Sequence, residues 1–238
     1  MTIFITGASK GIGKAMALHL AARGHNMVIN GSRDFDALNE VHQNILQLGA
    51  KSLPLFGDVS DYDTTYGFFE KISDKFGCID VLINNAGISH IGFFADMQEN
   101  QWRRLINVNL FGVINCCHAA VPYMLNAGNG RIINISSIWG NVGASCEAVY
   151  SMTKGGVNAF TKSLAKELGM SGICVNAIAC GLIDTEMNSA LDNNDLEDFI
   201  NRLALKRQGR PEEVACLAEF IINADYVTGE IFTLDGGY

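Results

Sequence analysis

Residues 2–13 read TIFITGASKGIG, a short apolar run followed by a turn that contains three glycines. Ile12, Met16 and Leu20 then recur on one face of a helical pattern. The N-terminus of such a helix offers free N–H groups and the positive end of a dipole to phosphate groups. We therefore interpret the turn as part of a cofactor site, although three glycines alone would also suit a plain strand–helix connection.

The three glycines of this turn have separate expected roles. Gly7 permits the tight turn, Gly11 lets a pyrophosphate approach the backbone, and Gly13 lets the helix pack close to the strand. Their spacing is G-x-x-x-G-x-G, not the commoner G-x-G-x-x-G. The cofactor-binding residues that we expect in the turn are Gly7, Ser9, Lys10, Gly11, Ile12 and Gly13.

Strand-like apolar runs alternate with helix-like runs along the whole chain, with no break in composition. This alternation predicts an α/β fold with one doubly wound parallel sheet and helices on both faces, in a single domain over 1–238. Residues 182–210 are less regular and acidic, and we expect them to form a lid over the substrate. The expected strands are 2–6, 26–30, 52–57, 80–85, 131–136, 173–179 and 230–234. The expected helices are 11–23, 34–48, 61–76, about 96–126, 148–168 and one that Pro211 opens.

Composition excludes several classes of protein. The 238 residues carry 17 Lys and Arg against 25 Asp and Glu, with no basic run, so no nucleic-acid partner is expected. We find no apolar stretch long enough to cross a bilayer and no signal peptide, so no membrane association is expected. The seven cysteines include no Cys-x-x-Cys pair, which indicates reduced thiols, a cytoplasmic location and no metal.

Three motifs in order along the chain resemble the short-chain dehydrogenase/reductase superfamily. They are TGASKGIG at 6–13, NNAG at 84–87, and Tyr150-x-x-x-Lys154, and the match extends from residue 2 to residue 237. The resemblance implies a Rossmann-type sheet of about seven strands, a nicotinamide cofactor, and a homotetramer or homodimer. The overall pattern is most similar to reductases of 3-oxoacyl thioesters.

Tyr150 and Lys154 lie four residues apart on an expected helix, so they share a face. A nearby ammonium would lower the pKa of the phenol, which could then give its proton to the alkoxide formed as hydride arrives. Ser137 comes thirteen residues before Tyr150 and matches the family's catalytic serine, which polarises the substrate carbonyl. Ser136 is its rival, but adjacent strand residues face opposite ways, and we favour Ser137.

Asn109 matches the family's fourth catalytic residue, which holds a water that links Lys154 to solvent. The alternatives are that Asn109 only bonds backbone, or that Asn107 has this role. Further cofactor contacts follow from the resemblance: Tyr150 and Lys154 also touch the cofactor, and the others are Asp58, Val59, Asn85, Ala86, Gly87, Gly181, Ile183 and Thr185. One departure from the family is Cys180-Gly181, where members often have Pro-Gly.

The end of the second expected strand favours NADP(H) over NAD(H). NAD-preferring members place a carboxylate there, whereas this chain has Ser32 and Arg33 after two uncharged residues. Arg33 and Lys10 could pair with a 2′-phosphate, while Asp34 could cap the next helix instead of binding ribose.

The substrate is less well determined than the reaction. Trp139, Glu147, Ser137 and Tyr150 are the expected substrate contacts, and residues 182–205 of the expected lid carry six acidic side chains against Arg202. A carboxylate at Glu147 could receive a cationic substrate, and an acidic mouth would repel a carrier or coenzyme A thioester. The run SSIWG, GASCE and YS also resembles bacterial reductases of 5-aminopentanone on a lysine of elongation factor P. That alternative, other small, sugar or steroid ketones, and a non-enzymatic NADP sensor stay open.

Overall fold

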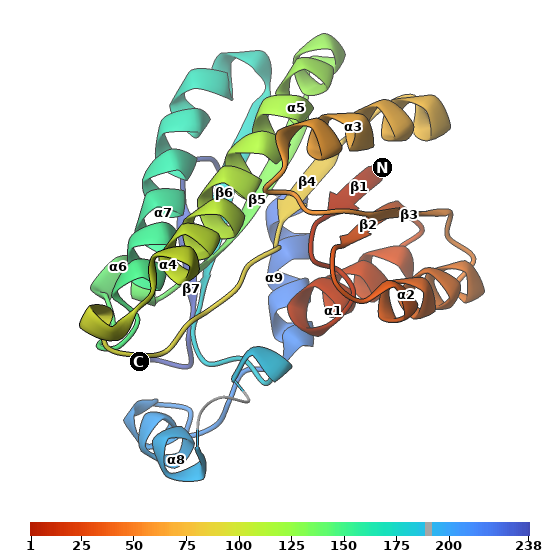
Figure 1. Cartoon of the computed structure of the whole chain (residues 1–238). Helices are drawn as coiled ribbons and strands as arrows, with labels where there is room; N and C mark the ends of the chain where they lie inside the picture. The colour runs from red at the N-terminus through yellow and green to blue at the C-terminus, as the bar shows by residue number, and fades with distance from the viewer. Residues whose placement is uncertain (189–191) are drawn as a thin grey trace.

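The computed structural model describes residues 1–188 and 192–238 and contains one sheet of seven parallel strands. The strand order is β3-β2-β1-β4-β5-β6-β7, so the chain winds outward in both directions from β1 (Figure 1). This arrangement confirms the expected doubly wound sheet. The strands are β1 (Thr2–Ile5), β2 (Asn26–Gly31), β3 (Ser52–Phe56), β4 (Val81–Asn84), β5 (Gly130–Ser137), β6 (Ile173–Cys180) and β7 (Ile231–Leu234).

Helices cover both faces of the sheet, as expected (Figure 1). One face packs against α1 (Gly11–Ala21), α2 (Phe35–Gln47) and α9 (Pro211–Ile222). The other face packs against α3 (Tyr62–Phe76), α5 (Gly112–Ala127) and α7 (Ala148–Leu168). Successive side chains of β1 alternate between the two cores: Ile3 and Ile5 join the first, and Phe4 joins the second.

Local signals in the sequence explain where these helices begin. Asp34 and Asp61 each accept a hydrogen bond from a first-turn N–H, of Ala37 and Thr64 respectively. Pro211 stands at the first position of α9, where its missing N–H costs nothing. The expectation that Asp34 is a helix cap is therefore confirmed.

The long helix expected over 96–126 is interrupted. It consists of a 3-10 turn (Phe94–Asp96), α4 (Glu99–Ile106), a π-helical turn (Asn107–Phe111) and α5. By length and hydropathy, Glu99–Ala127 could cross a membrane, so the statement that no stretch is apolar enough was wrong. Just over half of its most apolar window is buried, 56%, as in the core helix of a globular fold.

Residues 182–210 are more regular than expected. They contain a 3-10 turn (Glu186–Asn188) and α8 (Asn193–Arg202), which projects from the body of the molecule (Figure 1). Residues 189–191 of the expected lid lie outside the described residues. Backbone pairing of Ile183 with Gly209 joins the two ends of the segment. The Leu205 N–H also donates a hydrogen bond to the Gly236 carbonyl. Two further short helices, α6 (Trp139–Val142) and a 3-10 turn (Gly169–Ser171), were not expected.

Candidate active site

The glycine-rich turn leaves β1 at the carboxyl edge of the sheet and leads into α1. Gly7 has φ of 62°, which favours glycine. A Cβ at Gly13 would lie 2.3 Å from the Gly7 carbonyl oxygen, so only glycine lets the helix pack this close. The Asn85 side-chain amide donates to the carbonyls of Thr6 and Gly7 and fixes the turn against the end of β4.

A cleft runs along this edge of the sheet and fits a dinucleotide. Gly11 has φ of 55°, and a Cβ there would approach the Thr185 methyl to 3.4 Å, so a side chain would narrow the cleft. The first N–H groups of α1 open into this space without a side-chain cap from Lys10. Residues expected to bind cofactor line the cleft: Gly7, Ser9, Lys10, Gly11, Ile12, Ser32, Arg33, Asp58, Val59, Asn85, Ala86, Gly87 and Thr185.

Charged groups in the cleft differ in how far they are already paired. Lys10 forms an exposed ion pair with Glu186 at 2.5 Å, and Asp58 forms one with Arg104 at 2.6 Å. Arg33 is exposed and takes part in no ion pair among residues 1–188 and 192–238. Arg33 is therefore the more available of the two expected phosphate-binding cations.

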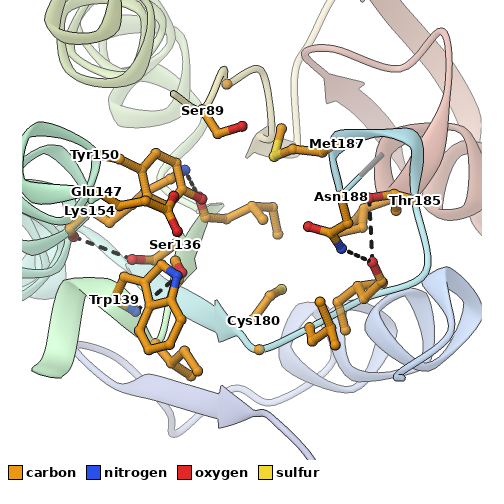
Figure 2. A pocket seen from close by; sticks show the side chains of 18 of the residues that line it. Ser89, Ser136, Trp139, Glu147, Tyr150, Lys154, Cys180, Thr185, Met187 and Asn188 are labelled. Carbon is orange, nitrogen blue, oxygen red and sulfur yellow. Dashed lines mark hydrogen bonds between the residues drawn. The ribbon is translucent and has the colours of Figure 1, made fainter. Parts of the chain in front are cut away.

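Beside the cleft, a second pocket brings together Ser137, Tyr150 and Lys154 (Figure 2). Ser137 ends β5 and lies near the Tyr150 hydroxyl, whose pKa it lowers, while the Lys154 ammonium donates to the Ile135 carbonyl at 2.8 Å. The Ser136 hydroxyl instead donates to the Lys154 carbonyl at 3.3 Å. Of the two serines, it is Ser137 that affects the ionisation of Tyr150.

Burial dominates the ionisation of the tyrosine and lysine. It raises the pKa of Tyr150 well above its ordinary value, and the negative charge of Glu147 raises it further, against a lowering hydrogen bond from Ser137. Burial also lowers the pKa of Lys154 to about 8. The net shift of the Tyr150 pKa is therefore upward for these residues alone, opposite to the lowering that was expected, because desolvation disfavours the phenolate.

Asn109 lies within the π-helical turn and is 1% exposed, whereas Asn107 faces solvent. Its side-chain amide both accepts from the Ile88 N–H and donates to the Ile88 carbonyl, each at 2.9 Å. This pair of bonds fixes the chain after β4, between the cleft and Lys154. The structure thus supports backbone bonding by Asn109, and a water-holding role stays a prediction.

Trp139 and Glu147, two further expected substrate contacts, lie on the same side of the pocket as Tyr150 (Figure 2). Burial raises the pKa of the Glu147 carboxylate, against a smaller lowering by the nearby Trp139 indole. The described acidic residues of the expected lid do not line this pocket. Glu186 is paired with Lys10, Asp192 caps α8, and the others face solvent. The acidic character of the pocket therefore comes from Glu147.

A family model described as short chain dehydrogenase matches residues 1–196, more than half of the chain. The chain belongs to this family. A 3-oxoacyl-acyl-carrier-protein reductase of Staphylococcus aureus is 38% identical over 235 residues, 98% of this chain and 96% of the relative. One from Synechocystis is 41% identical over 236 residues, 98% of this chain and 94% of the relative. The crystal structure of YwfH, an NADPH-dependent reductase involved in bacilysin biosynthesis, superposes with a TM-score of 0.93 at 32% identity, covering 99% and 97% of the two chains.

This short-chain dehydrogenase is an NAD(P)-dependent oxidoreductase that acts on a CH–OH group or the corresponding ketone. The resemblance found in its sequence is thereby confirmed. Its dinucleotide cleft and its Ser137–Tyr150 pocket meet at Gly87 and Thr185, and Gly181 and Ile183 line the pocket side. All expected cofactor contacts thus line these two adjoining spaces, apart from Gly13. Gly13 instead packs against the backbone of the glycine-rich turn.

At its one departure from the family pattern, the short-chain dehydrogenase places Cys180 on the pocket wall (Figure 2). Burial raises the pKa of this thiol to about 12, so it stays protonated at neutral pH. The following residue keeps the close packing that the turn needs, since a Cβ at Gly181 would lie 2.7 Å from the Asp235 Cα.

Several pocket residues of this short-chain dehydrogenase were missed in the sequence. Arg104 reaches Asp58 from α4, and no local pattern signals a contact across 46 positions. Ile88 could have been found, because it directly follows the NNAG motif. The other missed residues that line the substrate pocket include Ser89, Ile91, Ile135, Ile138, Leu182, Met187, Asn188 and Phe199.

Proposed function

We propose that this short-chain dehydrogenase uses NADPH to reduce a ketone to a secondary alcohol in the cytoplasm. The observation that supports this most directly is that Ser137, Tyr150 and Lys154 line one pocket, next to the dinucleotide cleft. A nicotinamide bound in the cleft supplies the hydride. The side chains of the pocket supply the proton and the polar groups that hold the carbonyl.

Ser137 and Tyr150 together hold the carbonyl oxygen, each through its hydroxyl. As the carbonyl carbon gains the hydride, its oxygen takes the electron pair of the broken π bond and then the phenolic proton of Tyr150. A buried tyrosine with a raised pKa keeps this proton at neutral pH, as reduction requires. Lys154, whose Nζ lies 5.7 Å from the centroid of the Tyr150 ring, stabilises the phenolate that remains.

The preference for NADPH over NADH rests on Arg33. Its exposed guanidinium lies at the end of β2, where no carboxylate other than the helix-capping Asp34 competes for a ribose. A 2′-phosphate can form charge-assisted hydrogen bonds with a guanidinium there. Lys10 contributes less, because Glu186 already neutralises it.

The relatives named 3-oxoacyl-acyl-carrier-protein reductase favour a 3-oxoacyl thioester as substrate. The pocket position of Glu147 favours the alternative of an amine-bearing ketone carried on a protein. The test is consumption of NADPH by the purified protein with an acetoacetyl thioester, its neutral ester and an amino-ketone, with the alcohol product identified by mass spectrometry. If none of these ketones is reduced, the proposed reaction fails.

We also propose a homotetramer or homodimer built on α5 and α7. Apolar side chains are exposed on this region, Phe111 at 49%, Ile114 at 40% and Met152 at 51%. Light scattering at micromolar concentration tests the assembly, and a stable monomer would contradict it.

A further inference from the structure

A carboxylate and a cluster of aromatic rings meet on one wall of the substrate pocket. The Trp139 ring packs edge-on against Phe199 at 5.7 Å and against Tyr238 at 5.3 Å between centroids. Phe199 and Tyr238 stack at 5.1 Å, so the three rings support one another. The Trp139 side chain lies near the Glu147 carboxylate and lowers its pKa, and Trp139, Phe199 and Glu147 all line the pocket.

Glu147 has no cationic partner within the part of the chain that the structure describes, since none of the ion pairs there includes it. The nearby buried cation, Lys154, donates instead to the Ile135 carbonyl. Even a single indole N–H could satisfy only part of what a carboxylate with two oxygens can accept. A half-buried carboxylate of this kind is stabilised when a ligand brings the missing positive charge.

We propose that Glu147, Trp139 and Phe199 form a subsite for an ammonium group of the substrate, while its ketone lies at Ser137 and Tyr150. The proposal rests on the proposed ketone reductase function and names the class of ketone. A carboxylate beside aromatic rings attracts an ammonium through its charge and through the ring quadrupoles. A purely acyl chain would leave the carboxylate without a counter-charge.

The test compares two ketones of the same shape that differ in charge. One is 5-(dimethylamino)pentan-2-one, whose tertiary amine is protonated at neutral pH and cannot close onto the ketone as an imine. The other is 6-methylheptan-2-one, its uncharged carbon isostere. The readout is the ratio of their kcat/KM values with NADPH, because any effect of Glu147 on the ionisation of Tyr150 acts on both ketones alike.

We expect the wild type to prefer the amino-ketone and Glu147→Gln to lower the ratio by about 10-fold, on the order of a well-placed exposed ion pair or cation–π contact. Phe199→Leu, which keeps apolar volume, should lower the ratio by about threefold. Glu197→Gln, on the exposed side of α8, is the matched control and should leave the ratio unchanged.

Two different failures are distinguishable. A wild type that prefers the isostere, or a ratio that Glu147→Gln leaves unchanged, overturns the ammonium subsite while ketone reduction stands. No turnover of either ketone, nor of the acetoacetyl ester, overturns the proposed reductase function itself. Thermal melting of each variant confirms that the fold is retained before the ratios are compared.

Discussion

Replacing Arg33 by alanine should weaken NADPH far more than NADH. Arg33 is exposed at the end of β2 and is free of ion pairs in the described chain, so its interaction with a 2′-phosphate is partly screened by water. A hydrogen bond to a charged group contributes about 1.5–3 kcal/mol, which corresponds to a loss of roughly 10- to 150-fold in NADPH affinity. NADH has no phosphate there, and its affinity should change by less than about twofold.

Fluorescence titration of both cofactors measures these affinities, and raised ionic strength should reduce the NADPH preference because the contact is exposed. Arg23→Ala is a matched control, since Arg23 is an exposed arginine paired with Glu219, away from the cleft. Glu186→Gln should strengthen NADPH binding by a few-fold, because it releases Lys10 from its ion pair. Equal weakening of NADPH and NADH by Arg33→Ala, or a wild-type preference for NADH, would refute the assignment.

Three further predictions concern the catalytic pocket. Tyr150→Phe should lower kcat by ~10²–10⁴-fold with little change in NADPH affinity, and near-wild-type turnover would exclude Tyr150 as the acid. Ser137→Ala should lower kcat by ~10²-fold or more and Ser136→Ala by less than about threefold, so the reverse order in steady-state assays would exchange their roles. Reduction should be constant at neutral pH and decline above about 8, where Lys154 loses its proton and no longer stabilises the phenolate. A rate that rises through this range would contradict the role of the ammonium.

The fold could be predicted because its signals are local. Each strand is a short apolar run, and each helix carries a periodic face and often a cap, so Ala148–Leu168 was predicted to the residue. The parallel order of the sheet follows from strict alternation of strand and helix. The interruption at Asn107–Phe111 was missed, because its extra residue per turn depends on packing around the buried Asn109 and not on a pattern in the sequence.

Residues of the site could be predicted only where they belong to a short sequence motif. The glycine turn and the Tyr150–Lys154 pair are short motifs, and they located both halves of the site. The ion pair of Lys10 with Glu186 joins residues 176 positions apart, and no local pattern could show it. Likewise, the number of lid carboxylates suggested an acidic pocket, but the sequence does not show where each side chain points, and among the described residues only Glu147 brings a carboxylate to the pocket wall.

The burial of Tyr150 and Lys154 follows from the fold and determines which form of the tyrosine is present for the proposed reaction. Tyr150 is 9% exposed and Lys154 is 6% exposed, because α7 packs its catalytic face against the end of β5. Desolvation holds the proton on the tyrosine, and the nearby carboxylate of Glu147 adds to this effect. A general acid must hold its proton until the carbonyl oxygen becomes strongly basic, which happens only as hydride arrives. The same burial disfavours the phenolate at neutral pH, so Tyr150 is present in the protonated form that the proposed ketone reduction uses.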